Sequence, residues 1–254
     1  DLCFDNRLAI GYRSGSQISR VVTEGWMAAN MIARYVVPLY YRITLPINPL
    51  LIFIVMIAAD FELKSRESRT AHIGNTVADG AYRTMIGRIT SLRNPNLFVM
   101  TYADWTVNNL LLIPNHFFIP AIIESATFEG KGKGAGWIGC NIGIGDIPES
   151  GKIFIIKKGI QEDKSKVIDL YQRSLALKTE EIDRRGWLLD VLRCLDRIPS
   201  NEFKLEQVYA FVNELHEKHP ENNFVKDKIR QQLQCLRDKG FIEFTARGQY
   251  RKTV

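Results

Sequence analysis

The sequence predicts an α/β or α+β core built on a mixed sheet, followed by a smaller unit of three helices and a β-hairpin. Two observations carry this prediction. In the first part, strand-like apolar runs alternate with helical patterns, an order that favours a mixed sheet with helices packed on it. In the last part, three amphipathic patterns precede two short strand patterns. We therefore expect two domains, residues 1–182 and 183–254.

The elements of the first unit follow from periodicity and from helix-breaking residues. A helix is expected from Ser16 to about residue 29, because Ile18, Val22 and Trp26 recur at near-helical spacing. A second helix is expected over residues 76–92, before an Asn-Pro pair ends it. Strands are expected at residues 97–102 and 107–113, short apolar segments at 137–139 and 153–156, and a charged connection between domains at 157–181.

The second unit has the element order of a winged helix-turn-helix. Its first helix contains Trp187 and ends before Pro199, and its third helix ends at Gly240. The remaining elements are a helix over 205–216, the third helix over 223–239, and strands at 241–244 and 249–252.

Positive charge is concentrated at one end of the chain. The formal net charge is +6, with 46% hydrophobic and 24% charged residues, which is ordinary for a globular protein. Residues 224–254 hold eight Lys or Arg against three Asp or Glu, a net of +5. This placement predicts a polyanionic partner for that end.

Composition also bears on compartment and membrane. The four cysteines are scattered, without the spacing of a disulfide framework or metal site, which favours a reducing compartment. No signal peptide is recognised, so we expect a cytoplasmic protein. The apolar run at residues 50–59 is too short to span a bilayer and is expected to be a buried strand.

Glu62 and Lys64 are the candidate catalytic residues. They follow an apolar run, and residues i and i+2 of a strand share one face. A carboxylate can hold Mg²⁺, and a lysine can steer or deprotonate a water, as phosphodiester hydrolysis requires. Alone, such a pair is far more often a solvated strand face.

The candidate DNA contacts lie on the third helix of the second unit and on its hairpin. Arg reads guanine and Gln reads adenine through bidentate hydrogen bonds, and basic side chains on the hairpin can meet phosphates. The alternative is a solvated charged helix in a protein-interaction module. The residues expected to contact DNA are Lys226, Lys228, Arg230, Gln231, Gln232, Arg247, Arg251 and Lys252.

Several stretches, in order along the chain, resemble the DpnI family of methyladenine-dependent restriction endonucleases. They include residues 16–17, 23–26, 61–65, 79–82, 94–96, 107–109, 135–141, 185–187, 228–234 and 248–252. The resemblance implies a PD-(D/E)xK nuclease core, a zinc ribbon inserted at about residues 30–60, and a C-terminal winged helix. It also implies cleavage of double-stranded DNA at adenine-methylated GATC, with recognition by both domains.

The resemblance assigns roles to individual residues. Glu62 would bind Mg²⁺ together with the backbone carbonyl of Leu63, and Lys64 would position or activate the attacking water. Trp137 is a candidate wall of a methyl pocket, although a single Trp is more often part of a core. We expect a monomer with no membrane association.

One segment departs from the family pattern. Residues 29–59 contain no cysteine and no acidic residue. Ile52 stands at the place of the family's metal-binding Asp, so the printed sequence lacks part of the metal site. The places of the four zinc cysteines are taken by Ala33, Val36, Val55 and Ala58.

We hypothesise that a shift of reading frame over about residues 29–59 accounts for this departure. Ala codons begin GC and Val codons begin GT, the endings of the two Cys codons. Reading one base earlier over residues 49–58 permits Pro-Val-Ala-Asp-Phe-Tyr-Cys-Asn-Asp-Cys, and over 33–37 permits Cys-Pro-x-Cys-Gly. Two Cys-x-x-Cys pairs and the Asp are thereby restored, a sound zinc signature. The alternatives are a diverged, zinc-free and inactive relative that still binds DNA, or a protein-interaction module.

Overall fold

The first unit is organised by a five-stranded mixed sheet with the strand order β1-β3-β4-β7-β8. The computed structural model describes residues 1–254 except 33–60, 71, 92, 128–136, 180 and 254. Only the β1–β3 pair is parallel, and the other pairs are antiparallel. The strands are β1 (Phe61–Glu67), β3 (Asn96–Ala103), β4 (Thr106–Ile113), β7 (Ile153–Lys157) and β8 (Ile160–Gln161).

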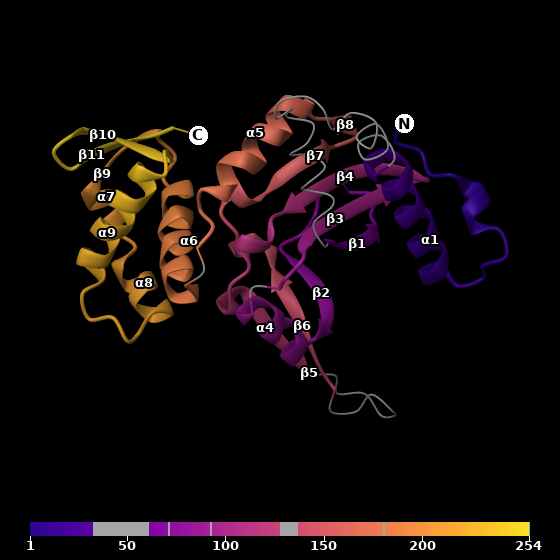
Figure 1. The fold of residues 1–254 in the computed structure, drawn as a ribbon, viewed down its shortest axis with the longest axis horizontal. Coiled ribbons are helices and arrows are strands. Elements are labelled where there is room, and N and C mark those ends of the chain that lie inside the picture. The colour runs from indigo at the N-terminus through magenta and orange to yellow at the C-terminus, as the bar shows by residue number, and fades with distance from the viewer. Residues whose placement is uncertain (33–60, 71, 92, 128–136, 180, 254) are drawn as a thin grey trace, which may run out of the picture.

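Both faces of this sheet are covered, which explains the continuous apolar runs in β3 and β4. On one face, helices α1 (Gly15–Met27) and α5 (Lys164–Leu175) pack against a core that includes Phe98 and Leu110. On the other face, α4 (Tyr82–Thr90) and a second sheet pack against Val99 and Leu111. Figure 1 shows these layers on the right-hand side of the molecule.

The second sheet corrects one sequence prediction. It is antiparallel with the order β2-β6-β5, from β2 (Thr76–Ala81), β6 (Ile138–Gly143) and β5 (Ile123–Thr127). The helix expected over residues 76–92 is therefore a strand followed by a shorter helix. Alternate residues of β2 are half-buried, the period of a strand, and β2 pairs with β6.

Helix α5 is part of the first unit's core. Its residues Val167, Ile168 and Tyr171 are buried against the large sheet. The charged segment 157–181 therefore connects the two units, as expected, and its helical stretch, α5, also belongs to the first unit's core.

The C-terminal unit has the predicted helix and hairpin order, with two refinements. The second expected helix is split into two short ones, and a short strand β9 joins the hairpin in a sheet ordered β10-β11-β9. The elements are α6 (Ile182–Asp196), β9 (Glu202–Lys204), α7 (Leu205–Tyr209), α8 (Val212–Lys218), α9 (Val225–Asp238), β10 (Ile242–Ala246) and β11 (Gln249–Lys252).

Short helical turns complete the structure. The 3₁₀ turns are η1 (Asn6–Ala9), η3 (Asn115–Phe117), η4 (Pro120–Ile122), η5 (Ile144–Asp146) and η6 (Glu149–Gly151), and η2 (Ala28–Ile32) is a π-helical turn. Of the described helices, none has both the length and the apolar character that crossing a bilayer requires.

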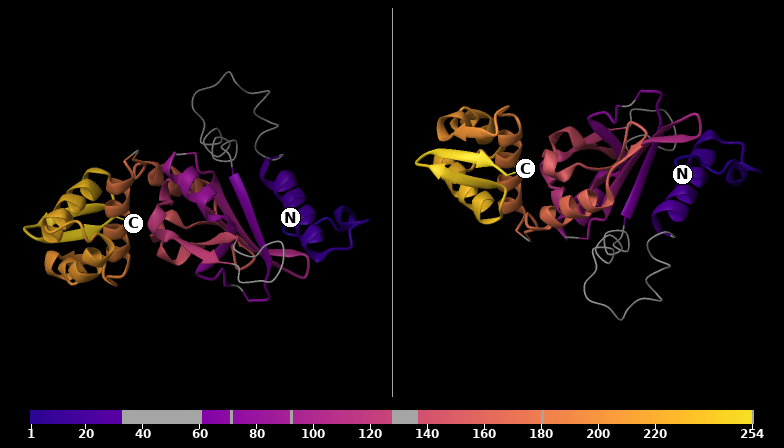
Figure 2. Two further views of the ribbon diagram at one scale, coloured as in Figure 1. Left: turned by 90° about the horizontal axis from the view of Figure 1, so that it is seen from below. Right: turned by 90° about the horizontal axis from the view of Figure 1, so that it is seen from above.

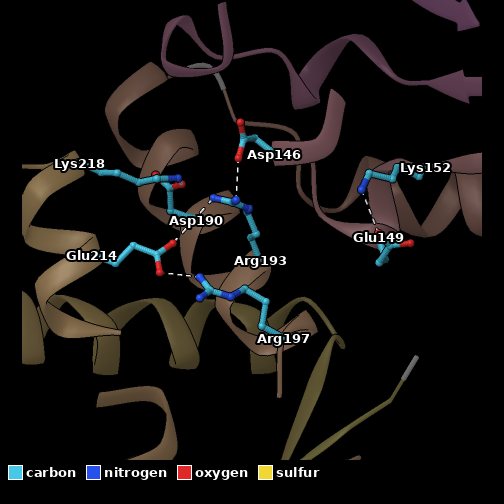
Figure 3. Close-up of polar contacts among 8 residues, drawn as sticks. All are labelled: Asp146, Glu149, Lys152, Asp190, Arg193, Arg197, Glu214 and Lys218. Atoms are coloured by element: carbon cyan, nitrogen blue, oxygen red, sulfur yellow. Dashed lines mark hydrogen bonds and ion pairs between the residues drawn. The ribbon is translucent and has the colours of Figure 1, made fainter. Parts of the chain in front are cut away.

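An ion pair joins the two units at α6, and further pairs within the C-terminal unit continue from it. Arg193 lies 2.6 Å from Asp146 of the first unit and also faces Glu214, which pairs with Arg197 (Figure 3). Both units flank this helix in the further views (Figure 2).

Candidate active site and nucleic-acid interface

Strand alternation brings Glu62 and Lys64 together at the edge of the large sheet. Strand β1 is an outer strand of that sheet, and its i and i+2 residues point to the same side. Lys64 Nζ lies 2.7 Å from Glu62 Oε1. Their side chains are 26% and 32% exposed, so this is a half-buried pair and not a solvated strand face.

Asp79 completes the cluster from the second sheet. Its Oδ1 atom lies 2.6 Å from Lys64 Nζ, and its side chain is only 9% exposed. The pairing of β2 with β6 shifts register between Asp79 and Ala81, as in a β-bulge. The backbone N–H of Gly80 donates to the same Asp79 oxygen at 2.7 Å.

Helix α4 adds a further cation. Arg88 Nη1 lies 3.7 Å from Glu62 Oε2. Positive and negative groups therefore alternate from Arg88 through Glu62 and Lys64 to Asp79. We call Glu62, Lys64 and Asp79 the β1–β2 cluster.

Mutual pairing shifts the pKa values of Lys64 and Asp79. Burial alone would lower the pKa of Lys64, but hydrogen bonds to Asp79 and Glu62 outweigh it and raise the pKa above its ordinary value. Burial alone would raise the pKa of Asp79, but hydrogen bonds from Lys64 and Gly80 outweigh it and lower the pKa. The cluster thus holds an ammonium and not a neutral amine at neutral pH.

A groove of about 790 Å³ runs along this edge of the sheet. Helix α1 forms one wall and is fixed by two hydrogen bonds, from Thr23 Oγ1 to Ser65 Oγ at 3.2 Å and from Tyr102 Oη to Ser19 Oγ at 2.8 Å. Strand β1, with Glu62 and Lys64, and residues 76–78 of β2 also line the groove. A strand of nucleic acid laid in the groove would meet both catalytic candidates.

The donor set at this edge suits a hard divalent cation. Carboxylate oxygens are the ligands that Mg²⁺ takes in proteins, and Glu62 supplies them beside the groove. Within the described residues, no group of three or more His, Cys, Asp or Glu comes together. The places assigned to the family Asp and zinc cysteines (Ile52, Ala33, Val36, Val55 and Ala58) lie outside the described residues.

The recognition-helix candidate α9 requires one correction. Gln232 is 3% exposed, packed among the inward residues Ile229, Leu233 and Leu236, so its expected place on the outward face was wrong. Gln232 lies three residues after Ile229 and four before Leu236, and these spacings place all three residues on the same, buried face of the helix.

The other outward residues of α9 differ in how freely they can reach a ligand. Arg230 is exposed but paired with Asp227 and with the hydroxyl of Tyr209. Lys226 lies over the Tyr209 ring. Gln231 is exposed and Lys228 half-exposed.

The hairpin presents Arg247 at its tip. Arg247 is exposed beside Gly248, whose φ of 70° lies in the left-handed region that glycine tolerates. Arg251 pairs with Glu202 at 2.8 Å. Lys252 turns inward and donates to the carbonyl of Ile198 at 2.5 Å.

Trp137 is not a core residue. It is 49% exposed at the start of β6, so the commoner core interpretation was wrong. A Cβ atom at Gly139 would lie 2.5 Å from Trp137 Cζ3. Only glycine therefore lets this ring lie over the strand, where its face is available to a ligand.

A second cavity, of about 620 Å³, lies between residues 119–121 and the C-terminal unit. Its wall includes Trp187, which stacks on His219 with ring centroids 4.0 Å apart. Both oxygens of Asp190 are engaged there, by Lys218 at 2.6 Å and His219 at 2.9 Å. These pairs brace α6 against α8, and the charge of Asp190 is already compensated.

Residues 1–180 match the DpnI, Dam-replacing family, and residues 183–252 match its helix-turn-helix domain. The chain belongs to this family. Its members are restriction endonucleases, and the second domain is a DNA-binding module. The sequence reasoning that singled out Glu62 and Lys64 gave Asp79 no role, although residues 79–82 were among the stretches that carried the resemblance.

Proposed function

We propose that this protein is a type II restriction endonuclease that cleaves double-stranded DNA at GATC sites methylated on adenine. The observation that carries the proposal is the half-buried Glu62–Lys64 pair beside a groove, on the same chain as a helix-turn-helix domain. The family supplies the expectation of methylated GATC. We further propose two domains, 1–182 and 183–254, acting as a monomer in the cytoplasm.

The catalytic roles follow from the chemistry of the β1–β2 cluster. Glu62 would bind Mg²⁺ with the backbone carbonyl of Leu63, and the cation, when bound, supplies positive charge that stabilises the phosphate in the transition state. Lys64 would orient the attacking water through its ammonium protons. Because the pKa of Lys64 is raised, we favour orientation of the water over its deprotonation.

DNA recognition is assigned to both units. On α9 and the hairpin, the side chains of Lys228, Gln231 and Arg247 would meet base edges and phosphates, and their full or partial exposure supports this role. The exposed ring of Trp137 is the candidate for apolar contact with the adenine methyl group.

A second function rests on the printed sequence. With Ile52 in place of the family Asp, the chain would be a winged-helix DNA-binding protein without nuclease activity. The frame hypothesis predicts instead that the folded protein contains four cysteines and an Asp in this segment. Intact mass would then differ from 29.1 kDa, and metal analysis would find one zinc per chain.

The deciding experiment compares two duplexes that differ only in adenine methylation of one GATC site. With Mg²⁺ we expect cleavage of the methylated duplex and none of the unmethylated duplex or of either duplex in EDTA. Binding that weakens steeply with salt, without cleavage, would establish the non-catalytic function instead.

A further inference from the structure

Asp79 differs from Glu62 in how firmly it is held. Its side chain is 9% exposed, whereas that of Glu62 is 32% exposed. A buried carboxylate is stable only when hydrogen-bonded and paired. Asp79 has both, an ammonium at 2.6 Å and the Gly80 N–H at 2.7 Å.

The bulge in β2 fixes the direction of this carboxylate. Bulges re-aim side chains next to functional sites, and here the bulge directs the N–H of Gly80 to the Asp79 oxygen that also meets Lys64. Rotation of Asp79 would break both bonds at once. Glu62, by contrast, lines the groove, and its carboxylate oxygens pair with the long cationic side chains of Lys64 and Arg88.

The two carboxylates therefore suit different tasks. A carboxylate that binds a metal must be able to leave the ammonium of Lys64, and Glu62 is the more exposed of the pair. The ammonium then needs a partner that stays in place. Asp79 is that partner, reaching across from the second sheet.

We propose that Asp79 is a positioning residue that holds the Lys64 ammonium at the reaction site while Glu62 serves the metal. This inference rests on the proposed nuclease function. It assigns Asp79 no direct contact with metal or DNA.

The test uses the full chain with Asp79→Asn, which keeps the size of the side chain but removes its charge. Single-turnover cleavage of the methylated duplex should fall about 10- to 100-fold, because misplacement of a catalytic group by about 1 Å can cost 10²-fold. Affinity for the duplex, and for Mn²⁺ measured calorimetrically, should stay at wild-type values. The matched control is Glu124→Gln on β5 of the same small sheet, which is exposed and should change nothing.

A spectroscopic readout tests the positioning without relying on cleavage. NMR of lysine ammonium groups detects those whose protons exchange slowly because they are held. We expect a Lys64 signal, identified by its loss in Lys64→Ala, that persists in Glu62→Gln and Asp79→Glu but disappears in Asp79→Asn. Thermal unfolding of each variant establishes that it is folded.

Three results would overturn the proposal: wild-type cleavage by Asp79→Asn, survival of its Lys64 signal, or a loss of Mn²⁺ affinity equal to that of Glu62→Gln. The last would make Asp79 a metal ligand. If the wild-type protein cut no methylated DNA, the proposed function would fail, and the NMR comparison would still decide whether Asp79 holds Lys64.

Discussion

The β1–β2 cluster and the recognition helix α9 both carry opposite charges, but they use them differently. In the β1–β2 cluster, Lys64 lies between two carboxylates from different sheets, and all three side chains are at least half-buried. On α9, the pair of Arg230 and Asp227 is exposed and lies within one helical turn. Exposed pairs of this kind contribute only about 0–1 kcal/mol, so they can be exchanged for contacts with a ligand.

This difference separates charged residues that hold each other inside the fold from charged residues on the surface that can bind a ligand. Removing Lys64 from the β1–β2 cluster leaves the carboxylate of Asp79 buried without its cationic partner, which is costly. Removing a charge from the Arg230–Asp227 pair on α9 leaves no buried charge without a partner, because both side chains are exposed to solvent. Substitutions should therefore affect chemistry in the first region and affinity in the second.

The largest expected effect is that of Glu62→Gln on cleavage. Loss of the carboxylate removes the proposed metal ligand, and we expect the single-turnover rate to fall by about 10²- to 10³-fold, the usual scale for losing an electrostatic group in an active site. Glu67→Gln, at the exposed end of the same strand, is the control. Equal rates for the two variants would remove Glu62 from the site.

His116 shows what burial does to an ionisable group that no ion pair compensates. Within the described residues, its Nε2 atom has no hydrogen-bond partner. Burial lowers the pKa of His116 to about 4. A hydrogen bond with the backbone of Ser174 opposes this shift, and the nearby charges of Lys178 and Arg185 act in the same direction as burial. Below about pH 6.5 the unfolded chain therefore takes up a proton that the folded chain does not.

The corresponding stability is present above about pH 6.5 and is lost as the pH falls towards 4. A shift of this size is on the order of 3 kcal/mol in the free energy of unfolding. Urea unfolding across this pH range measures the free energy of unfolding, which should fall in both proteins because carboxyl groups titrate in both. The fall should be smaller for His116→Gln than for the wild type, because the variant lacks the buried imidazole. Exposed His72→Gln should follow the wild type, and parallel curves for all three proteins would contradict the assignment.

The smallest effect is expected from a matched pair on α9. Gln231→Leu should weaken binding to the methylated duplex by about 1–3 kcal/mol, the scale of one lost bidentate base contact. Gln232→Leu should leave affinity unchanged, because Gln232 is buried. Fluorescence anisotropy titrations measure both, and a greater loss for Gln232→Leu would reverse the inferred orientation of the helix.

Local patterns explain what the sequence could predict. Helix α1, strands β3 and β4, and the helices and hairpin of the C-terminal unit follow from periodicity and stop residues. The approach of Glu62 to Lys64 follows from strand alternation alone. The burial of Gln232 was also readable, since residue 232 falls on the helical stripe through Ile229 and Leu236.

Contacts between distant segments explain what the sequence could not predict. Half of the residues of strand β2 are Ala or Gly, and this weak pattern resembles the start of a helix as much as a strand. Asp79 meets Lys64 only because β2 pairs with β6 and the resulting sheet packs beside the large one. That arrangement depends on pairing between segments about 60 residues apart, which periodicity within either segment does not encode.

The central claim is that the β1–β2 cluster serves the chemistry of cleavage while DNA affinity resides elsewhere in the chain, and Lys64→Ala tests it most directly. Binding and cleavage of the methylated duplex should be measured on one preparation, with Lys157→Ala of the same sheet as control. The account predicts that Lys64→Ala binds as the wild type does but cuts at least about 10²-fold more slowly. Cleavage at the wild-type rate, or loss of binding in parallel with cleavage, would contradict it.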